Sequence, residues 1–283
     1  MNFSKIDLHC HSYESDGFLS PGDVVERASE NGVKLLALTD HDTISGQKEA
    51  MLKARALDVQ MVSGIELSCV WRHFTIHILA YNFSLDDGLM LEVQETQTAA
   101  RHARADLISE RLAKKGFPDL LGKAQNLSRS GIPGRPHFAQ AMVDAGMVGN
   151  IGEAFKKYLG AGKIGDVKSM WPELSEVLSW IKNANGTAVI AHPRKYNMTL
   201  TKLRELITEF KTCGGEGIEV ITSGQKQGEV GMMSDLCQRM DLKGSLGSDF
   251  HTPKFPWAEL GRIPKLPKNV QPIWAGWAYD GEV

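Results

Sequence analysis

Histidine and acidic residues recur at the ends of those segments of this chain that have strand-like composition. Six of the nine histidines belong to such motifs, and two of the motifs are Asp7-Leu8-His9-Cys10-His11 and Ser248-Asp249-Phe250-His251. In a parallel α/β barrel the carboxyl ends of the strands meet at one mouth, so residues far apart in sequence come together there. The pattern therefore predicts an α/β barrel with a metal-binding cluster at one end.

The candidate ligands are a mixed set of imidazoles and carboxylates. His9 and His11 are two residues apart on a predicted strand, so both side chains point to one face. Such ligands suit Mn²⁺, Zn²⁺ or Fe²⁺, and the set is larger than one ion needs. The sequence therefore predicts two or three divalent ions, with Mn²⁺ favoured over Zn²⁺ and Fe²⁺. The candidate metal ligands are His9, His11, Asp16, His41, Glu66, His77, His192, Asp249 and His251.

The bulk composition is that of a globular protein. The chain has 283 residues, of which 42% are hydrophobic and 23% charged, and these values are ordinary for a folded domain. The sequence shows no leader-like start and no apolar stretch of membrane-spanning length. Cys10, Cys69, Cys213 and Cys237 lack metal-binding or disulfide spacing. We therefore expect reduced thiols, a cytoplasmic location, no membrane contact and no obligate protein partner.

Charge is distributed unevenly along the chain. Residues 98–168 hold 12 lysines and arginines against 6 acidic residues, a net charge of +6, which leaves −8 for the rest of a chain whose total is −2. A basic segment beside an acidic metal site could attract a phosphate-rich ligand, although a solvated helical face would have the same composition.

Strand and helix signals alternate along most of the chain and predict a parallel sheet. The predicted strands are Lys5–His9, Val33–Leu38, Val59–Val62, Phe74–Tyr81, Thr187–Ala191, Gly217–Ile221 and Lys243–Gly247. The predicted helices between them run from Pro21 to Gly32 and over Gln47–Leu57, Pro172–Ala184, Thr199–Lys211 and Gly228–Met240.

Strand signals vanish in the middle of the chain. A long helix is predicted over Asp87–Lys115, with shorter ones over Pro136–Ala145 and Gly152–Leu159. The sequence thus predicts a metal-binding barrel formed by residues 1–85 and 167–283, interrupted by a helical insertion of residues 86–166. Beyond Pro253 we expect an irregular, packed tail that contains Trp257, Trp274 and Trp277.

At the nine candidate ligands the chain resembles the PHP (polymerase and histidinol phosphatase) family of amidohydrolase-like barrels. The resemblance implies a distorted (β/α)7 barrel with a trinuclear site. By analogy, one ion would be held by His9, His11, Glu66 and Asp249, and a second by Glu66, His77 and His192. A third would be held by Asp16, His41 and His251. Asp40 and Asp42, which flank His41, would orient the ligands.

Within that family the chain resembles the TrpH-like group, which includes nucleoside 3′,5′-bisphosphate phosphatases and a 5′→3′ exoribonuclease. The resemblance rests on total length, on the helical insertion and on the segment Gly134-Arg135-Pro136-His137-Phe138. Arg135 and His137 lie at a predicted helix start, where an arginine fork and the helix terminus favour a phosphate. A surface salt bridge is the alternative role for Arg135. Arg194 and Lys195 follow His192 directly and are further candidate substrate-binding residues.

The resemblance implies a metal-dependent phosphoesterase acting on a nucleotide or a short RNA with a 5′-phosphate. Glu66, His192, Asp249 and Arg135 are the residues we expect to take part in catalysis. A histidinol-phosphate-type monoester phosphatase is one alternative, although it needs no basic insertion. A non-catalytic metal-binding module is another, although such a module would be attached to a polymerase.

Overall fold

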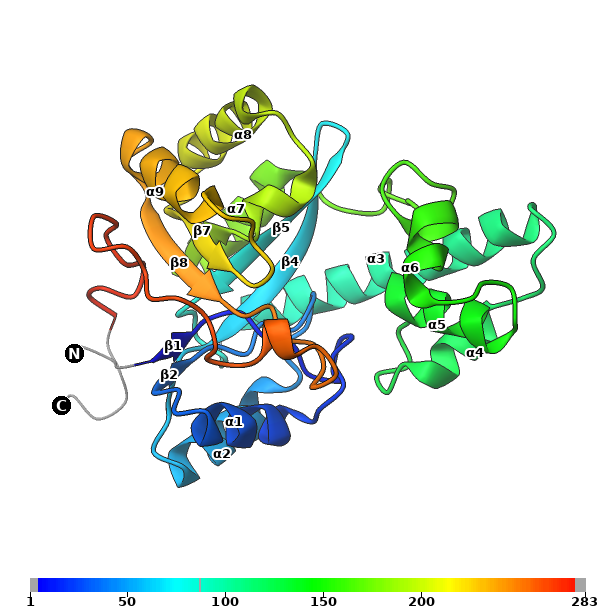
Figure 1. Cartoon of the computed structure of the whole chain (residues 1–283), viewed down its shortest axis with the longest axis horizontal. Coiled ribbons are helices and arrows are strands. Elements are labelled where there is room, and N and C mark those ends of the chain that lie inside the picture. The colour runs from blue at the N-terminus through cyan, green and yellow to red at the C-terminus, as the bar shows by residue number, and fades with distance from the viewer. Residues whose placement is uncertain (1–4, 87, 278–283) are drawn as a thin grey trace.

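The computed structural model describes residues 5–86 and 88–277, so predictions that fall on residues 1–4, Asp87 and residues 278–283 lie outside the described part. The described strands form two sheets (Figure 1). A parallel three-stranded sheet has the order β1-β2-β3, and a five-stranded sheet has the order β4-β5-β6-β7-β8. The strands are β1 (Ile6–Asp7), β2 (Leu35–Leu36), β3 (Gln60–Met61), β4 (Gly64–Trp71), β5 (Phe74–Tyr81), β6 (Thr187–Ile190), β7 (Gly217–Thr222) and β8 (Lys243–Gly247).

Backbone contacts join the two sheets at both margins. Leu8 N donates to Leu246 O at 3.1 Å, beside β1 and β8. Isolated bridges pair Cys10 with Phe250 and His41 with Glu66. The mixed α/β fold is confirmed. Among the described residues the sheets do not close into one barrel, so the predicted distorted (β/α)7 barrel is not confirmed.

The prediction of an all-parallel sheet is wrong for the hairpin of β4 and β5. These strands are antiparallel in a register from Gly64–Tyr81 to Trp71–Phe74, and β5 is also antiparallel to β6. The turn between them places Arg72 at a φ of 55°. The hairpin matters for the site because Glu66 lies on β4 and His77 lies on β5, with both side chains able to reach the end of the sheet.

Helices cover the sheets where the sequence predicted them. Ser20 caps the start of α1, because its Oγ accepts from Asp23 N at 3.0 Å, and Pro21 occupies the first turn, where its missing N–H costs nothing. α7, α8 and α9 lie along the five-stranded sheet, and α1 and α2 lie below the smaller sheet (Figure 1). Their bounds are α1 (Pro21–Glu30), α2 (Gln47–Ala56), α7 (Leu174–Asn183), α8 (Leu200–Thr212) and α9 (Glu229–Arg239).

The middle of the chain is helical and lies to one side of the sheets (Figure 1). Its own buried cluster includes Ile108, Leu112, Phe138, Met142 and Leu159. α4 was not predicted, and the stretch predicted as one helix over Gly152–Leu159 is α6 followed by a π-helical turn, η1. The elements are α3 (Gly88–Ala113), α4 (Leu121–Leu127), α5 (Arg135–Asp144), α6 (Ile151–Ala154) and η1 (Phe155–Leu159).

α3 ties this helical segment to the sheets. Its first turns contribute Met90 and Val93 to the main core. Farther along, Arg101 Nε donates to Asp42 Oδ2 at 2.7 Å, in an ion pair that is almost entirely buried. The helix is therefore anchored next to His41. The division of the chain at residues 86 and 166 stays a prediction.

The segment after β8 packs only in part. Trp277 is 9% exposed, as expected for a packed tail, whereas Trp257, in the short 3-10 helix η3 (Pro256–Ala258), is 63% exposed. The expectation that Trp257 packs is wrong. Within the described residues, none of the helices combines the length and the apolar character that crossing a membrane requires.

Candidate metal centre

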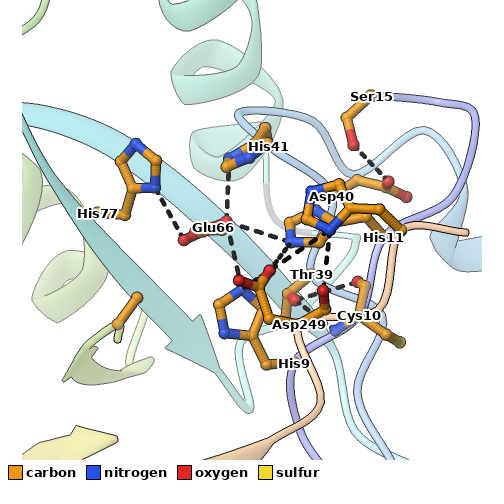
Figure 2. A network of polar contacts seen from close by, with 12 residues as sticks. His9, Cys10, His11, Ser15, Thr39, Asp40, His41, Glu66, His77 and Asp249 are labelled. Carbon is orange, nitrogen blue, oxygen red and sulfur yellow. Dashed lines mark hydrogen bonds and ion pairs between the residues drawn. The ribbon is translucent and has the colours of Figure 1, made fainter. Parts of the chain in front are cut away.

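Glu66 lies at the middle of the cluster of predicted ligands. Its Oε1 is 2.9 Å from His77 Nδ1 and 2.9 Å from His192 Nε2. Its Oε2 is 2.9 Å from His41 Nδ1 and 3.3 Å from Nε2 of both His9 and His11. One carboxylate on β4 thus faces five imidazoles, and Figure 2 labels four of them, those of His9, His11, His41 and His77.

The two histidines that follow β1 lie on the same side as predicted and meet a second carboxylate. Asp249 Oδ1 is 3.4 Å from His9 Nε2 and 3.2 Å from His11 Nε2. Figure 2 shows Asp249 and Glu66 approaching these rings together. Donor atoms of His9, His11 and Glu66 lie within 4.8 Å of one another, which is close enough for one ion.

A third carboxylate brings in the last predicted ligands. Asp16 Oδ1 is 3.2 Å from His251 Nε2, and its Oδ2 is 3.9 Å from His41 Nε2. Every predicted ligand therefore belongs to at least one group of donors compact enough for a cation. These groups are His11–Asp16–His41–His251, His9–His192–Asp249, His9–His11–Glu66 and His41–Glu66–His77.

The residues fit divalent cations on their own chemistry. Buried donor atoms without a hydrogen-bond partner include His9 Nε2, both ring nitrogens of His11, His41 Nδ1 and Glu66 Oε2. Buried polar atoms left unpaired are costly, and an ion would pair them. Burial, followed by the nearby His251 and His41 rings, lowers the pKa of His11 to about 3. This imidazole is therefore neutral, as a metal ligand must be.

The cluster holds Glu66 ionised. Burial alone would raise the pKa of Glu66, but the imidazoles of His41, His9 and His77 outweigh it and keep the pKa well below its usual range. An ionised carboxylate with both oxygens facing donors can serve more than one cation.

Two predicted ligands lie on strained backbone. His192 has a φ of 29° and Asp249 a φ of 52°, in the left-handed region. Such residues cost on the order of 1–3 kcal/mol and cluster at functional sites. Gly247 allows close packing against His9, because a Cβ at Gly247 would lie 2.2 Å from His9 Cβ. Glycine at the end of β8 lets β1 approach closely enough to deliver His9.

Sequence analysis missed Glu219, a buried carboxylate on β7. Its Oε1 is 3.0 Å from His9 Nδ1, and its Oε2 accepts from the backbone N–H of His192 at 2.6 Å. An acid inside the otherwise apolar run Gly217-Ile218-Glu219-Val220-Ile221 was the available signal. Glu219 orients one ligand and the backbone of another.

The two acids that flank His41 act on loops rather than on the ligands themselves. Asp40 accepts from the N–H and Oγ of Ser12 and from Ser15 Oγ, at 2.6–2.7 Å. Asp42 accepts from the N–H and Oγ of Ser68 as well as from Arg101. They hold the loop that carries Asp16 and the helix α3 in place.

Lys195 and Tyr196 lie in η2 (Pro193–Tyr196), directly after His192. Lys195 Nζ contacts Asp249 Oδ2. Tyr196 Oη donates to Ala191 O at 2.8 Å and accepts from His77 N at 3.0 Å, so it holds the strand of His77 against the turn of His192.

A cavity of about 300 Å³ opens beside the cluster, and Arg135 lines it together with five of the predicted ligands. Arg135 Nη1 donates to Leu159 O at 3.3 Å and lies 3.8 Å from Asp166 Oδ1. Lys168, which sequence analysis did not single out, lines the same wall. The other lining residues are His41, Phe74, Thr75, His77, Ala161, Asp166, His192, Lys195, Tyr196, Asn197, Asp249 and His251.

The two other predicted substrate residues have different surroundings. His137 Nδ1 accepts from Gly134 N at 3.0 Å and so caps its own helix. Arg194 Nε donates to Glu229 Oε1 at 3.2 Å and lines a separate cavity of about 410 Å³ that shares His192, Lys195 and Asn197 with the first.

Residues 7–188 of this chain match the model of the PHP domain. The chain belongs to the PHP domain family. The match begins two residues before His9 and takes in the hairpin that carries Glu66 and His77. Six of the nine predicted ligands therefore lie within the matched residues, and His192, Asp249 and His251 lie beyond them.

Relatives of the whole chain carry more specific names. It is 42% identical over 270 residues to a 5′-3′ exoribonuclease of Haemophilus influenzae, covering 95% of this chain and 98% of the relative. It is 35% identical over 272 residues to a 3′,5′-nucleoside bisphosphate phosphatase of Chromobacterium violaceum, covering 96% and 95%. These relatives confirm the resemblance to a PHP group with both activities.

A solved structure supports the same assignment. A Chromobacterium violaceum amidohydrolase, determined with bound sulfate and no metal, has a TM-score of 0.89 and 34% identity over 96% of this chain and 95% of its own. The PHP fold of the present chain is therefore similar over nearly its full length.

Proposed function

We propose that this chain is a metal-dependent hydrolase of the 3′-phosphoester in 5′-phosphorylated nucleotides or RNA. The observation that carries the proposal is the wall shared by Arg135 and the ligand cluster in one cavity. The cluster suits a reacting phosphoester, and Arg135 offers a cation to a second phosphate. The names of the Haemophilus and Chromobacterium relatives support the same two substrates.

Two or three divalent ions would be held by the predicted ligand sets. His9, His11, Glu66 and Asp249 would form one set and Glu66, His77 and His192 the next, with Asp16, His41 and His251 as the third. When bound, such ions lower the pKa of water and neutralise phosphate oxygens. Mn²⁺ remains the ion that we propose first, and the same imidazole and carboxylate donors would also suit Zn²⁺ or Fe²⁺.

The chain's own residues would bind and orient the substrate. Arg135, and with it Lys168, would face the 5′-phosphate from the helical side. Lys195, next to Asp249, would approach the reacting phosphate from η2. Arg194 and His137 remain proposed substrate-binding residues. Each already has a hydrogen-bond partner within the chain, so we propose a more distant role for them. Within this proposal Glu66, His192, Asp249 and Arg135 are the catalytic set.

A bisphosphate and an RNA strand would present the same groups to this cavity. Both carry a 5′-phosphate, and both carry the scissile ester at the 3′ position. They differ in what is attached beyond that ester. We therefore propose one geometry for both activities, acting in the cytoplasm, where the four unpaired cysteines would stay reduced.

The test compares ten-residue oligoribonucleotides with 5′-phosphate and 5′-hydroxyl ends, together with a simple phosphomonoester, at full metal occupancy. The proposal expects strong preference for the 5′-phosphate. Hydrolysis of the simple monoester together with removal of only the terminal 5′-phosphate, with every phosphodiester left intact, would favour a general monoester phosphatase. Absence of turnover with bound metal would favour a non-catalytic module.

A further inference from the structure

Three exposed aromatic side chains lie beside the candidate metal centre. In the described part of the chain, the exposed phenylalanine and tryptophan side chains are those of Phe18 (54%), Phe255 (46%) and Trp257 (63%). Phe18 belongs to the loop that carries Asp16, and the other two follow His251. Scattered exposed rings are normal, whereas a group of them on one face marks an interaction site.

A backbone hydrogen bond and a cation–π contact connect Phe18 to the segment that carries Phe255 and Trp257. Phe18 N donates to His251 O at 2.7 Å, which fixes the two loops side by side. Lys254 Nζ lies 5.6 Å from the centre of the Phe18 ring. The rings of Phe255 and Trp257 stack on each other with centroids 4.7 Å apart and planes 27° apart. We call Phe18, Lys254, Phe255 and Trp257 the aromatic patch.

The aromatic patch lies close to the centre but outside its cavity. Phe255 follows His251 by four residues, so their Cα atoms cannot be more than about 14 Å apart. None of the patch residues lines the cavity that Arg135 shares with the ligand cluster. A small substrate held in that cavity would leave the patch uncovered, whereas a strand leaving the cavity could extend over it.

We propose that the aromatic patch is a stacking surface for unpaired bases of an RNA strand, on the 3′ side of the phosphoester being hydrolysed. The proposal rests on the proposed function. Aromatic rings stack on any base, because every base has a π face, and lysine supplies the charge that follows a phosphate backbone. The exposed Lys254 and the direct link to loops bearing candidate ligands favour a nucleic acid over a protein partner.

The test uses Trp257→Ala and Trp257→Phe in the full chain, with two substrates. Loss of the ring should lower kcat/KM for a ten-residue 5′-phosphorylated oligoribonucleotide by about 5- to 150-fold. Hydrolysis of a nucleoside 3′,5′-bisphosphate should change less than about twofold. Trp257→Phe should keep most of the oligonucleotide activity. Leu200→Ala, an exposed apolar residue on α8, is the matched control and should change neither reaction.

A second substrate links the effect to a base. With an oligonucleotide that is abasic beyond its first residue, the kcat/KM of the wild-type enzyme should fall by at least the factor caused by Trp257→Ala, and on that substrate Trp257→Ala should match the wild type. Equal loss on the oligonucleotide and the bisphosphate, or an unchanged oligonucleotide rate, would overturn the proposal. A lower molecular mass of Trp257→Ala than of wild type in sedimentation equilibrium would also overturn it, because the patch would then be an interface between copies of this chain.

Failure of the proposed function would be visible separately, as wild-type protein that turns over neither substrate. The patch would then be tested by fluorescence anisotropy of a labelled oligoribonucleotide. Weaker binding to Trp257→Ala by the same factor would support it, and equal affinities would reject it.

Discussion

Oε1 of Glu219 lies 3.0 Å from Nδ1 of His9, and this contact leaves Nε2 as the His9 nitrogen that faces Glu66 and Asp249. A carboxylate behind a histidine fixes the ring and its tautomer, and removing such a partner typically weakens metal binding by about 10- to 100-fold. Glu219 belongs to β7, so a residue of the five-stranded sheet holds the His9 ring in position.

Glu219→Gln should therefore lower metal affinity by about 10- to 100-fold. Glutamine keeps only one acceptor oxygen, whereas the carboxylate serves both His9 and the backbone of His192. Metal titration followed by calorimetry measures the effect. Glu216→Gln, near the start of the same strand and paired with Lys243, is the control. Unchanged affinity in Glu219→Gln would mean that Glu219 has only a packing role.

Glu66→Ala should lower the metal content and reduce activity by on the order of 1,000-fold or more, because charge stabilisation by bound ions contributes several kcal/mol. Both oxygens of Glu66 face candidate ligands, so its loss affects more than one ion. Elemental analysis of the purified variant, with Glu176→Ala on α7 as control, measures the content. Full occupancy and a near-normal rate would disprove the bridging role.

Arg135→Ala should leave the metal content unchanged and weaken substrates with a second phosphate. The loss of a partly buried charged contact costs about 2–3 kcal/mol, or roughly 30- to 150-fold in kcat/KM. Arg111→Ala is the control, because Arg111 also donates to a backbone carbonyl in the helical segment. If a simple monoester loses as much as a bisphosphate, Arg135 acts at the reacting phosphate or supports the fold.

The buried ion pair of Arg101 and Asp42 should dominate the anchoring of α3. Removing either partner leaves the other charge buried, so Arg101→Ala should lower the free energy of unfolding by about 3–5 kcal/mol. Combining Arg101→Ala with Asp42→Asn should cost less than the sum of the single changes, as urea denaturation would reveal. Strictly additive losses would mean that the two side chains act independently.

The ion pair of Glu259 with Arg27 predicts a contribution to stability that depends on pH. Two hydrogen bonds, at 2.6 and 2.8 Å, join them, and the arginine holds the pKa of Glu259 below its usual range. The contribution is present above the carboxyl's unfolded pKa and is lost as the pH falls through its folded pKa. Glu259→Gln should lower the free energy of unfolding by about 1 kcal/mol at neutral pH. The difference from wild type should shrink in acid, and a constant difference would contradict the account.

Helix positions could be predicted because their signals are local. Ser20 and Pro21 mark the start of α1, and apolar periodicity marks most of the others. β4 was missed although Ile65 and Leu67 alternate with the polar Glu66 and Ser68, because Glu66 was interpreted as a strand-end ligand. Its antiparallel pairing depends on the turn at Arg72 and on long-range contacts, which no local pattern contains.

The ligand set could be proposed because each member lies in a short motif of its own. Glu219 was missed because it is far from those motifs in sequence and meets His9, which follows β1, only in the folded chain. The backbone strain at His192 and the contact of Lys195 with Asp249 likewise arise from tertiary structure. The motifs predict the candidate metal ligands, whereas the residues that position those ligands depend on tertiary contacts.

The measurement that tests the central claim most directly is the identification of the products formed from adenosine 3′,5′-bisphosphate by metal-loaded enzyme. Chromatography with phosphate analysis separates the possible nucleotides. The account predicts adenosine 5′-phosphate and inorganic phosphate, because Arg135 would hold the 5′-phosphate while the 3′-phosphoester meets the ligand cluster. Release of adenosine 3′-phosphate, or no turnover at full metal occupancy, would contradict it.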